Sequence, residues 1–480
     1  MFFGFKNLTE EYNRIIEEGA KTAISNKEFL QKEIAKWKVS PKRQEQITGE
    51  KYYNGFHDIL LRQRTAVGEN GKLITVDNLP NNRIVDNQYQ KAVDQKTNFI
   101  VGQPITFHAD NEQYNELLQD IFNRKFMRIF KAVCTDCFNG GLAWLYPYYD
   151  ESGEFCFKRF SAHEILPFWQ DSEHTKLDCA VRLYEVNCYE GQTEKVIEKV
   201  EVYTAQGVER YVLDNGVLVL DVENPSSDYI NIDNTGFNWA RIPLIAFRYN
   251  YSEIPLIRNA KPLQDSINTM LSDFQNNMQE DSRNTILVLK NYDGENLGEF
   301  RRNLATYGAV KVRDDGGVET LSVDVNAENY KAIIEMAKKE LISSVKGYDV
   351  AELRSSGTPN EMNIKSVFND ISMDANSMEI ELQAGFDELL WFVNAHLANS
   401  GKGSFENEDV EIIFNMDTIV NESQVIEDIK NSVGIISDET LIVNHPWIDD
   451  VEEELARLKK EKEQEAQDYL QPIPEQPIEE

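Results

Sequence analysis

The sequence predicts an α+β fold in which helices predominate, and three observations support this. The first third of the chain shows mostly helical periodicity. Residues 142–250 instead form short runs rich in β-branched and aromatic residues, separated by turn signals. Three long helical patterns follow, at about 262–283, 327–346 and 358–399. A chain of 480 residues has room for about three domains.

The N-terminal third opens with a clear helix start. Ser25 and Glu28 form a capping box, so a helix is predicted from there to the residues before Pro41. A second helix is predicted over residues 83–99, where apolar side chains recur at helical spacing. Residues 111–139 predict one or two further helices.

The middle of the chain has the period of strands. Residues 142–146, 155–160 and 179–184 are short β-type runs. Residues 150–153 and 214–216 carry the Asp, Asn and Gly of tight turns. Together these features predict an antiparallel meander attached to the helical part.

Two of the long helices flank a small insert. The helix from about Pro262 to Arg283 carries one apolar stripe, and the helix at 327–346 carries another and ends at Gly347. Between them the sequence predicts a small αβ unit, with strands at 286–289 and 309–312 and a short helix at 295–307.

The third long helix has the sharpest start in the sequence. Thr358 is a suitable N-cap, Pro359 takes the first helical position and Glu361 the third. The helical pattern that follows would be roughly 60 Å long if straight. Because that exceeds a typical globular helix, a kink is predicted at residues 372–377 or at Gly385.

The C-terminal part is short and acidic. A strand is predicted at 410–414, short helices over about 423–460, and a disordered tail over 466–480. The whole chain has a formal net charge of −33 and a pI near 4.6. Solubility is one explanation of this charge, and a surface that touches DNA without holding it is another; composition alone does not choose between them.

No motif in the sequence indicates an enzyme. Cys134 and Cys137 form a lone CxxC inside a helical pattern, so buried thiols are predicted rather than a metal or redox site. The loop 68–72 lacks the Ser or Thr that a phosphate-binding loop needs after its Lys, and no two His have zinc-site spacing. We therefore expect no catalytic residue, no metal and no cofactor. The odd number of Cys, five, fits a reducing cytoplasm, and we expect no signal peptide and no membrane span.

Several phrases together are similar to a known family. The chain resembles the portal (head–tail connector) proteins of long-tailed bacteriophages that infect Gram-positive bacteria. The phrases lie at residues 52–58, 82–86, 99–104, 141–145, 241–247, 263–268, 434–440 and 444–447. Their order and spacing carry the resemblance, which covers nearly the whole chain.

The resemblance implies a role for each part of the chain. It assigns a wing to residues 1–255, stem helices to 256–283 and 327–346, a clip to 284–326, a tunnel loop to 347–357, a long kinked helix and the return strand of the wing to 358–420, a crown to 421–465 and an acidic tail to 466–480. It also implies a dodecameric ring at one capsid vertex. Double-stranded DNA would pass through this ring during packaging and ejection.

The resemblance further implies candidate site residues and partners. The DNA-facing candidates in the tunnel loop are Asp349, Glu352, Arg354, Ser355 and Ser356, and the stem channel candidates are Asp265, Asp273, Glu280 and Asp281. The clip candidates for partner docking are Asp293, Glu295, Arg301, Arg302, Asp314 and Asp315. The expected partners are other copies of the chain, DNA in transient non-specific passage, the terminase large subunit, the major capsid protein, the scaffolding protein and the head-completion adaptor. The expected location is the virion, after assembly in the host cytoplasm.

Two other functions remain open at this stage. One is a metal-dependent nucleic-acid enzyme, which would need a spatial cluster of carboxylates that the sequence does not show. The other is a different head–tail ring protein of a phage. The order of long helix, insert, long helix, loop and very long helix favours the portal.

Overall fold

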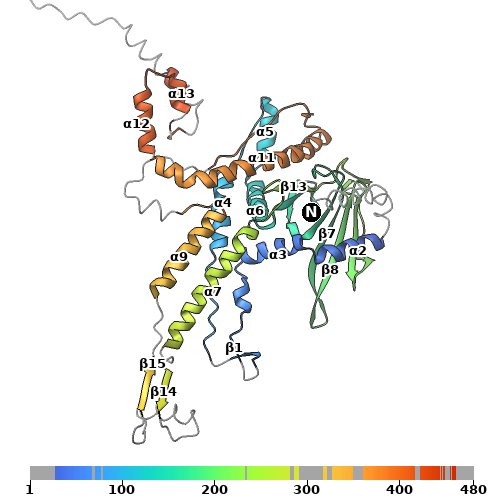
Figure 1. Cartoon of the computed structure of the whole chain (residues 1–480). Helices are drawn as coiled ribbons and strands as arrows, with labels where there is room; N and C mark the ends of the chain where they lie inside the picture. The colour runs from blue at the N-terminus through green and yellow to red at the C-terminus, as the bar shows by residue number, and fades with distance from the viewer. Residues whose placement is uncertain are drawn as a thin grey trace, which may run out of the picture. The chain divides into compact units, whose positions relative to one another are not determined.

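The computed structural model describes two compact units. The described residues are 27–67, 71–76, 79–232, 235–281, 286–290, 317–321, 327–349, 361–416, 422–443, 445, 447–448, 454–455 and 457–460. The first unit comprises the chain up to Tyr348 together with Asp370–Met416, and the second comprises Asp349–Asn369 and the chain from Asp417 onward. Figure 1 shows the course of the chain. Helices hold more residues than strands, which confirms the predicted α+β class.

The first unit begins with two successive helices. Helix α2 (Lys27–Lys38) ends before Pro41, as predicted. Helix α3 (Pro41–Tyr53) follows at once because Ser40 caps it: the Ser40 side chain accepts a hydrogen bond from the Arg43 N–H at 3.3 Å. Pro41 fits the first helical position, where no intrahelical N–H bond is lost.

The predicted antiparallel strands are present, but they divide between two sheets: the run at 179–184 belongs to a five-stranded sheet, and the runs at 142–146 and 155–160 belong to a three-stranded one. The first is a five-stranded antiparallel meander. Its strands follow one another in order: β6 (Ile165–Trp169), β7 (Leu177–Glu190), β8 (Thr193–Thr204), β9 (Gly207–Asp214) and β10 (Val217–Leu220). Helix α2 packs on one face, where Leu30, Ile34 and Trp37 join a buried cluster with the sheet. A second sheet has the order β13 (Ile245–Arg248), β4 (Leu142–Tyr149), β5 (Phe155–Phe160).

Three helices and several short elements complete the compact part of this unit. The helices are α4 (Gln88–Val101), α5 (Glu112–Ile121) and α6 (Arg124–Gly140), and the last two confirm the prediction for 111–139. The short elements are η1 (Asp58–Leu61), β1 (Thr65–Val67), β2 (Leu73–Thr75), β3 (Thr106–His108), η2 (Ala162–Glu164), β11 (Ile230–Ile232), β12 (Thr235–Phe237) and β16 (Glu411–Ile413). Strand β16 was predicted and pairs with β3.

Helix α11 (Glu361–Asn399) lies against the aromatic core of the first unit. Phe386 of this helix contacts Phe130 at 4.7 Å and Phe247 at 5.3 Å between ring centroids. A Cβ at Gly385 would lie 2.6 Å from the Phe247 ring, so this glycine allows close packing. The helix runs without interruption through both predicted kink positions.

The two predicted helices around the insert are present. Helix α7 (Ile257–Asp281) begins more than one turn before Pro262, the start predicted from periodicity, and next to residue 256, the start that the resemblance implies. The periodicity prediction was late because backbone bonds such as Ala260 N–H to Leu256 O already form a turn ahead of the proline. Helix α9 (Ala327–Ser344) matches its prediction.

The insert contributes a hairpin of β14 (Ile286–Lys290) and β15 (Gly317–Leu321). Strand β14 was predicted and β15 was not. The predicted strand at 309–312 and helix at 295–307 lie outside the described residues.

The second unit contains the predicted short C-terminal helices. These are α12 (Glu422–Ser432) and α13 (Asp438–Val443), joined through a bridge between Val433 and Ile436. The predicted tail at 466–480 lies outside the described residues.

Candidate functional site: the α7–α9 helix pair and its supports

Helices α7 and α9 lie side by side and are joined through the β14–β15 hairpin (Figure 1). Their contact includes Phe274 and Tyr330, whose ring centroids are 5.3 Å apart. The Asn277 amide also donates to the Tyr330 hydroxyl at 3.1 Å. The predicted apolar stripes therefore meet within one chain.

A second, polar face of α7 is fully buried. Gln264, Asn268, Ser272 and Asn276 recur every four residues and are 0% exposed; we call them the polar ladder. Their side-chain oxygens accept backbone N–H groups from the preceding part of the chain. The four bonds are Asn276 to Asn82 N–H at 2.7 Å, Ser272 to Ile84 N–H at 2.9 Å, Asn268 to Asp86 N–H at 3.0 Å and Gln264 to Tyr89 N–H at 2.9 Å.

The polar ladder explains why the helix predicted from Arg83 begins later. Residues 82–87, which we call the strap, run in a non-helical course along α7 because alternate N–H groups are bound by its side chains. The helix α4 starts only at Gln88, where Asn87 caps it by accepting the Gln90 N–H at 2.9 Å. The predicted start is therefore wrong by about one turn.

His57 connects the polar ladder to the end of α3. Its ring lies 4.4 Å from that of Tyr52, and it hydrogen bonds to the Asn268 amide at 2.7 Å and to the Tyr52 carbonyl at 3.0 Å. Burial lowers the pKa of His57, which favours the neutral ring that this pair of bonds requires. His57 is therefore a packing residue in the described structure.

Two of the predicted channel acids are ion-paired within the chain. Asp265 accepts from the Tyr52 hydroxyl and from Lys261, both at 2.6 Å. Asp273 accepts from Arg62 at 2.6 Å. Neither carboxylate stands as a free charge, and the side chains of Glu280 and Asp281 lie outside the described part of the structure. The assignment of these acids to a channel stays a prediction.

The end of α9 is anchored by a buried charge. Lys96 of α4 is 1% exposed, and its ammonium donates to Asp374 of α11 at 2.8 Å and to the Lys346 carbonyl at 3.2 Å. Lys346 also pairs with Asp374 at 2.7 Å, and Tyr249 donates to the same carboxylate at 2.8 Å. Lys346 has φ 52°, and the Gly347 N–H caps α9 by donating to Ile342 O at 2.8 Å.

Of the remaining predicted site residues, Asp349 is described and follows directly after this anchor. The other tunnel-loop candidates, Glu352, Arg354, Ser355 and Ser356, lie outside the described residues. So do all the clip candidates: Asp293, Glu295, Arg301, Arg302, Asp314 and Asp315.

The CxxC cysteines are structural. Cys134 and Cys137 lie buried in α6, and the Cys137 thiol donates to Phe247 O at 3.2 Å. Burial raises the pKa of both thiols, which disfavours the thiolate that metal binding or redox chemistry needs. The prediction of buried thiols is confirmed.

Among the described residues one group of potential metal ligands occurs, at the β4–β5 turn. Asp150, Glu154 and Cys156 bring their ligand atoms within 4.8 Å of one another. Asp150 already accepts the N–H groups of Ser152 and Glu154 at 2.9 Å each. This carboxylate therefore stabilises the turn, as the sequence predicted for a turn at 150–153.

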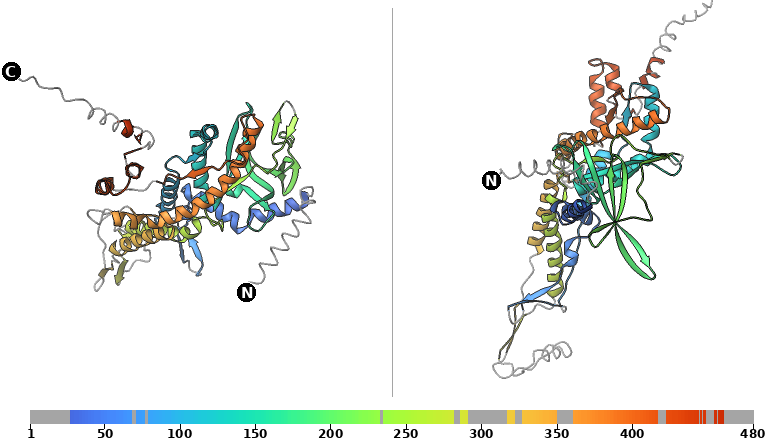
Figure 2. Two further views of the ribbon diagram at one scale, coloured as in Figure 1. Left: turned by 90° about the horizontal axis from the view of Figure 1, so that it is seen from above. Right: turned by 90° about the vertical axis from the view of Figure 1, so that its right-hand side faces the viewer.

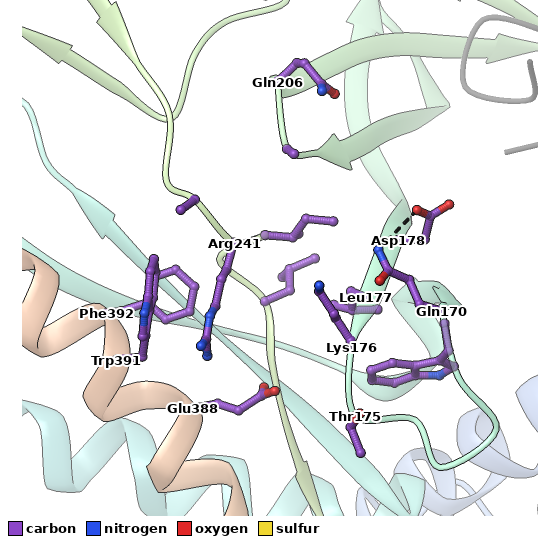
Figure 3. Close-up of a pocket in the computed structure, with 15 residues that line it drawn as sticks. Gln170, Thr175, Lys176, Leu177, Asp178, Gln206, Arg241, Glu388, Trp391 and Phe392 are labelled. Carbon is purple, nitrogen blue, oxygen red and sulfur yellow. Dashed lines mark hydrogen bonds between the residues drawn. The ribbon is translucent and has the colours of Figure 1, made fainter. Parts of the chain in front are cut away.

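A hollow of about 820 Å³ lies between α11 and the sheets (Figure 3). Trp391 forms one wall, and the Arg241 guanidinium lies 4.6 Å from its ring. Lys176 and Arg241 supply two positive charges, and Asp178 and Glu388 supply two negative ones. A lining with balanced charge selects neither an anion nor a cation, so the hollow does not indicate a ligand.

None of the helices in the described parts of the chain has the length and apolar character needed to cross a membrane.

Comparison with known proteins identifies the family. The family model described as phage portal protein, SPP1 Gp6-like, matches residues 35–468. The chain is 30% identical over 469 residues to the portal protein of Bacillus phage SPP1, covering 96% of this chain and 92% of that protein. It is 26% identical over 428 residues to the portal protein of Clostridium phage phiCD119, covering 86% of this chain and 91% of that protein. The chain therefore belongs to the SPP1 Gp6-like family of phage portal proteins.

Proposed function

We propose that copies of this chain form a ring whose central channel carries double-stranded DNA into and out of the phage head. The family match over residues 35–468 is the observation that carries this proposal. The match spans the order α7, β-hairpin, α9, α11, which supports assigning these elements to the channel. Twelve subunits and a position at one capsid vertex follow from the family resemblance. On this proposal the protein is a structural component of the virion and not an enzyme.

The structural features that support the proposed channel lie mainly in the stem helices α7 and α9. The α7–α9 pair would surround the channel, and the polar ladder would hold α7 to the wing of its own subunit. The hairpin β14–β15 would form the base of the clip. Residues 347–357 would form the tunnel loop, and their first residues follow the Lys96–Asp374 anchor. The helices α12 and α13 would belong to the crown.

The partners are proposed from the family resemblance. The clip would receive the terminase large subunit during packaging and the head-completion adaptor afterwards. The wing would meet the major capsid protein, and the scaffolding protein would guide assembly in the host cytoplasm. The candidate docking residues in the clip are those named from the sequence.

Charge gives the channel proposal a physical basis. Each subunit has a formal net charge of −33. A ring of twelve would carry roughly −400, so DNA within about 10 Å of an acidic wall would be repelled rather than adsorbed. Weak binding suits a channel through which thousands of phosphates must pass.

The decisive experiment is negative-stain microscopy of the purified protein. Rings with a central hole support the proposal, and particles without rings over a wide concentration range contradict it. Salt titration of DNA binding supplies a second test, because tight affinity with a steep salt slope at physiological salt would contradict passage by sliding. Nuclease assays with and without Mg²⁺ test the enzyme hypothesis, since hydrolysis that depends on Mg²⁺ would favour it.

A further inference from the structure

An apolar projection extends from the first unit beside α7. We call described residues 56–67, 71–76 and Leu79 the apolar limb. Six of its large apolar side chains are between 36% and 83% exposed: Phe56, Leu60, Leu61, Leu73, Ile74 and Leu79. Figure 1 and the left view of Figure 2 show its hairpin, β1–β2, standing clear of the other described elements.

The apolar limb is held in an ordered conformation rather than collapsed. Its outgoing and returning runs are joined by bonds from Val76 N–H to Arg64 O at 2.9 Å and from Asn81 to Arg62 O at 3.2 Å. The base is fixed to α7 through the pair of Arg62 with Asp273 and through the strap. The exposed side chains are therefore presented on a fixed support.

An isolated two-stranded hairpin is at best marginally stable in water. In the described structure β1 and β2 pair with each other, and β2 is exposed along its whole length. Several large, exposed apolar side chains on one fixed projection indicate a protein interface. The apolar limb therefore lacks a covering surface within the described part of its own chain.

The same chain presents a second uncovered apolar surface on α9. Ile334 and Leu341 of this helix are buried, whereas Ile333 and Met336, three residues apart on another face, are 46% and 65% exposed. Two different uncovered surfaces on one chain suit a head-to-tail contact, in which each copy uses one surface for each neighbour. Such contacts close into rings when the rotation between copies allows it.

We propose that the apolar limb packs on the Ile333–Met336 face of α9 in a neighbouring copy of this chain. This inference rests on the proposed ring, and it names the surfaces through which adjacent subunits meet. The limb supplies rigid branched side chains, and Met336 supplies a side chain that adapts to their shape. Because the limb is fixed to α7 of its own subunit, this contact would link the stem helices of neighbours.

Photo-crosslinking tests the contact directly. A photoreactive benzoylphenylalanine replaces Ile74, and equal amounts of ¹⁴N- and ¹⁵N-labelled protein are mixed before assembly. The proposal expects crosslinked peptides of mixed isotope that join the limb to α9. The matched control places the same probe at Val222, which is 90% exposed in the loop after β10. Adducts of one isotope only, or mixed adducts that map outside α9, would overturn the proposal.

Assembly variants provide the second test. Leu61→Ser combined with Ile74→Ser, and separately Met336→Lys, should raise the protein concentration needed for ring assembly about tenfold or more, because each removes apolar contact area. The control pair Val219→Ser with Val222→Ser removes exposed apolar side chains elsewhere and should leave assembly unchanged. Circular dichroism and thermal unfolding of each variant establish that its subunits fold.

The two proposals fail in different ways. Normal rings from the limb variant would overturn this inference and leave the portal function standing. Wild-type protein that never forms rings would overturn the portal proposal, and this inference with it.

Discussion

Removing the two members of the buried Lys96–Asp374 pair should have unequal effects. Asp374→Asn leaves the Lys96 ammonium, 1% exposed, without its counter-charge, and the pKa of Lys96 is already lowered by burial. Lys96→Met instead leaves Asp374 with two partners, Lys346 at 2.7 Å and Tyr249 at 2.8 Å. Methionine also fills a similar volume. We therefore expect Asp374→Asn to be much the more destabilising.

The expected magnitudes follow from the burial of the pair. Leaving one buried charge unpaired costs about 3–5 kcal/mol, whereas removing the desolvated cation costs about 1 kcal/mol or less. Hydrogen exchange of α4 and α11 amides measures the local opening free energy. A loss of about 3 kcal/mol speeds exchange by roughly 100-fold. The Lys96→Met protein should change less than tenfold, and its melting temperature should stay close to that of the wild type.

The stability lost in Asp374→Asn should also depend on pH. With Asp374 neutralised, the pKa of Lys96 falls further, so the folded state binds fewer protons than the unfolded state below the ordinary lysine pKa. The stability deficit of Asp374→Asn relative to wild type should therefore shrink as pH rises from 7 toward 10. Equal losses in the two variants, or a deficit that does not change with pH, would refute the account of this pair.

Three further perturbations test other parts of the fold. Ser272→Ala leaves the partly buried Ile84 N–H without its acceptor and should cost about 1–3 kcal/mol, seen as faster exchange in the strap; unchanged exchange would contradict the polar ladder. Gly385→Ala places a methyl group against the Phe247 ring and should lower the melting temperature through a cost of about 1–3 kcal/mol, while an unchanged value would show that the ring yields. Burial alone would raise the pKa of Glu253, but its bonds with His174 and Lys42 outweigh burial and lower the pKa to about 2. The ionised carboxylate therefore contributes about 3 kcal/mol of stability above pH 4.5, and this contribution should be lost as pH falls toward 2. Unfolding measured across that range should show no such loss in Glu253→Gln.

The elements predicted correctly from sequence are those specified by local signals. Strands β4, β5 and β7 follow from short runs of β-branched and aromatic residues, and the turn at 214–216 follows from its Asp, Asn and Gly, because this information lies within a few residues. Helix α9 follows from its apolar stripe and its stop at Gly347. In these segments the local conformational preference agrees with the tertiary structure, so periodicity was enough to predict the secondary structure.

The strap shows where such reasoning fails. Val85 and Tyr89 have helical spacing, and the pattern gives no reason to delay the helix to Gln88. The competing bonds come from Ser272 and its neighbours, which lie more than 180 residues further along the chain. A local sequence pattern contains no information about hydrogen-bond acceptors that only the tertiary fold brings close to the strap.

The polar ladder was visible in the sequence but its meaning was not. Gln264, Asn268, Ser272 and Asn276 occur at every fourth position, opposite an apolar stripe. On an amphipathic helix such a row usually faces water. Only the bound backbone N–H groups show that this row is a buried interface, which is why α7 is covered on two faces within one chain.

The ion pairs on α7 weaken the repulsion of DNA that the acids of this helix could supply. The sequence suggested an acidic row along this helix, but Arg62 neutralises Asp273 and Lys261 neutralises Asp265 within the subunit. Opposite charges less than 3 Å apart form a dipole, whose field falls off faster with distance than that of a free charge. DNA at the centre of a wide pore would therefore sense these two acids weakly. The repulsion proposed for DNA must come from the excess of acids over the whole chain, 82 against 49 bases, and not from this row. On the proposed function, weak DNA binding would depend on the net charge of the ring, while Asp265 and Asp273 fix α7 to the segment that carries Tyr52 and Arg62.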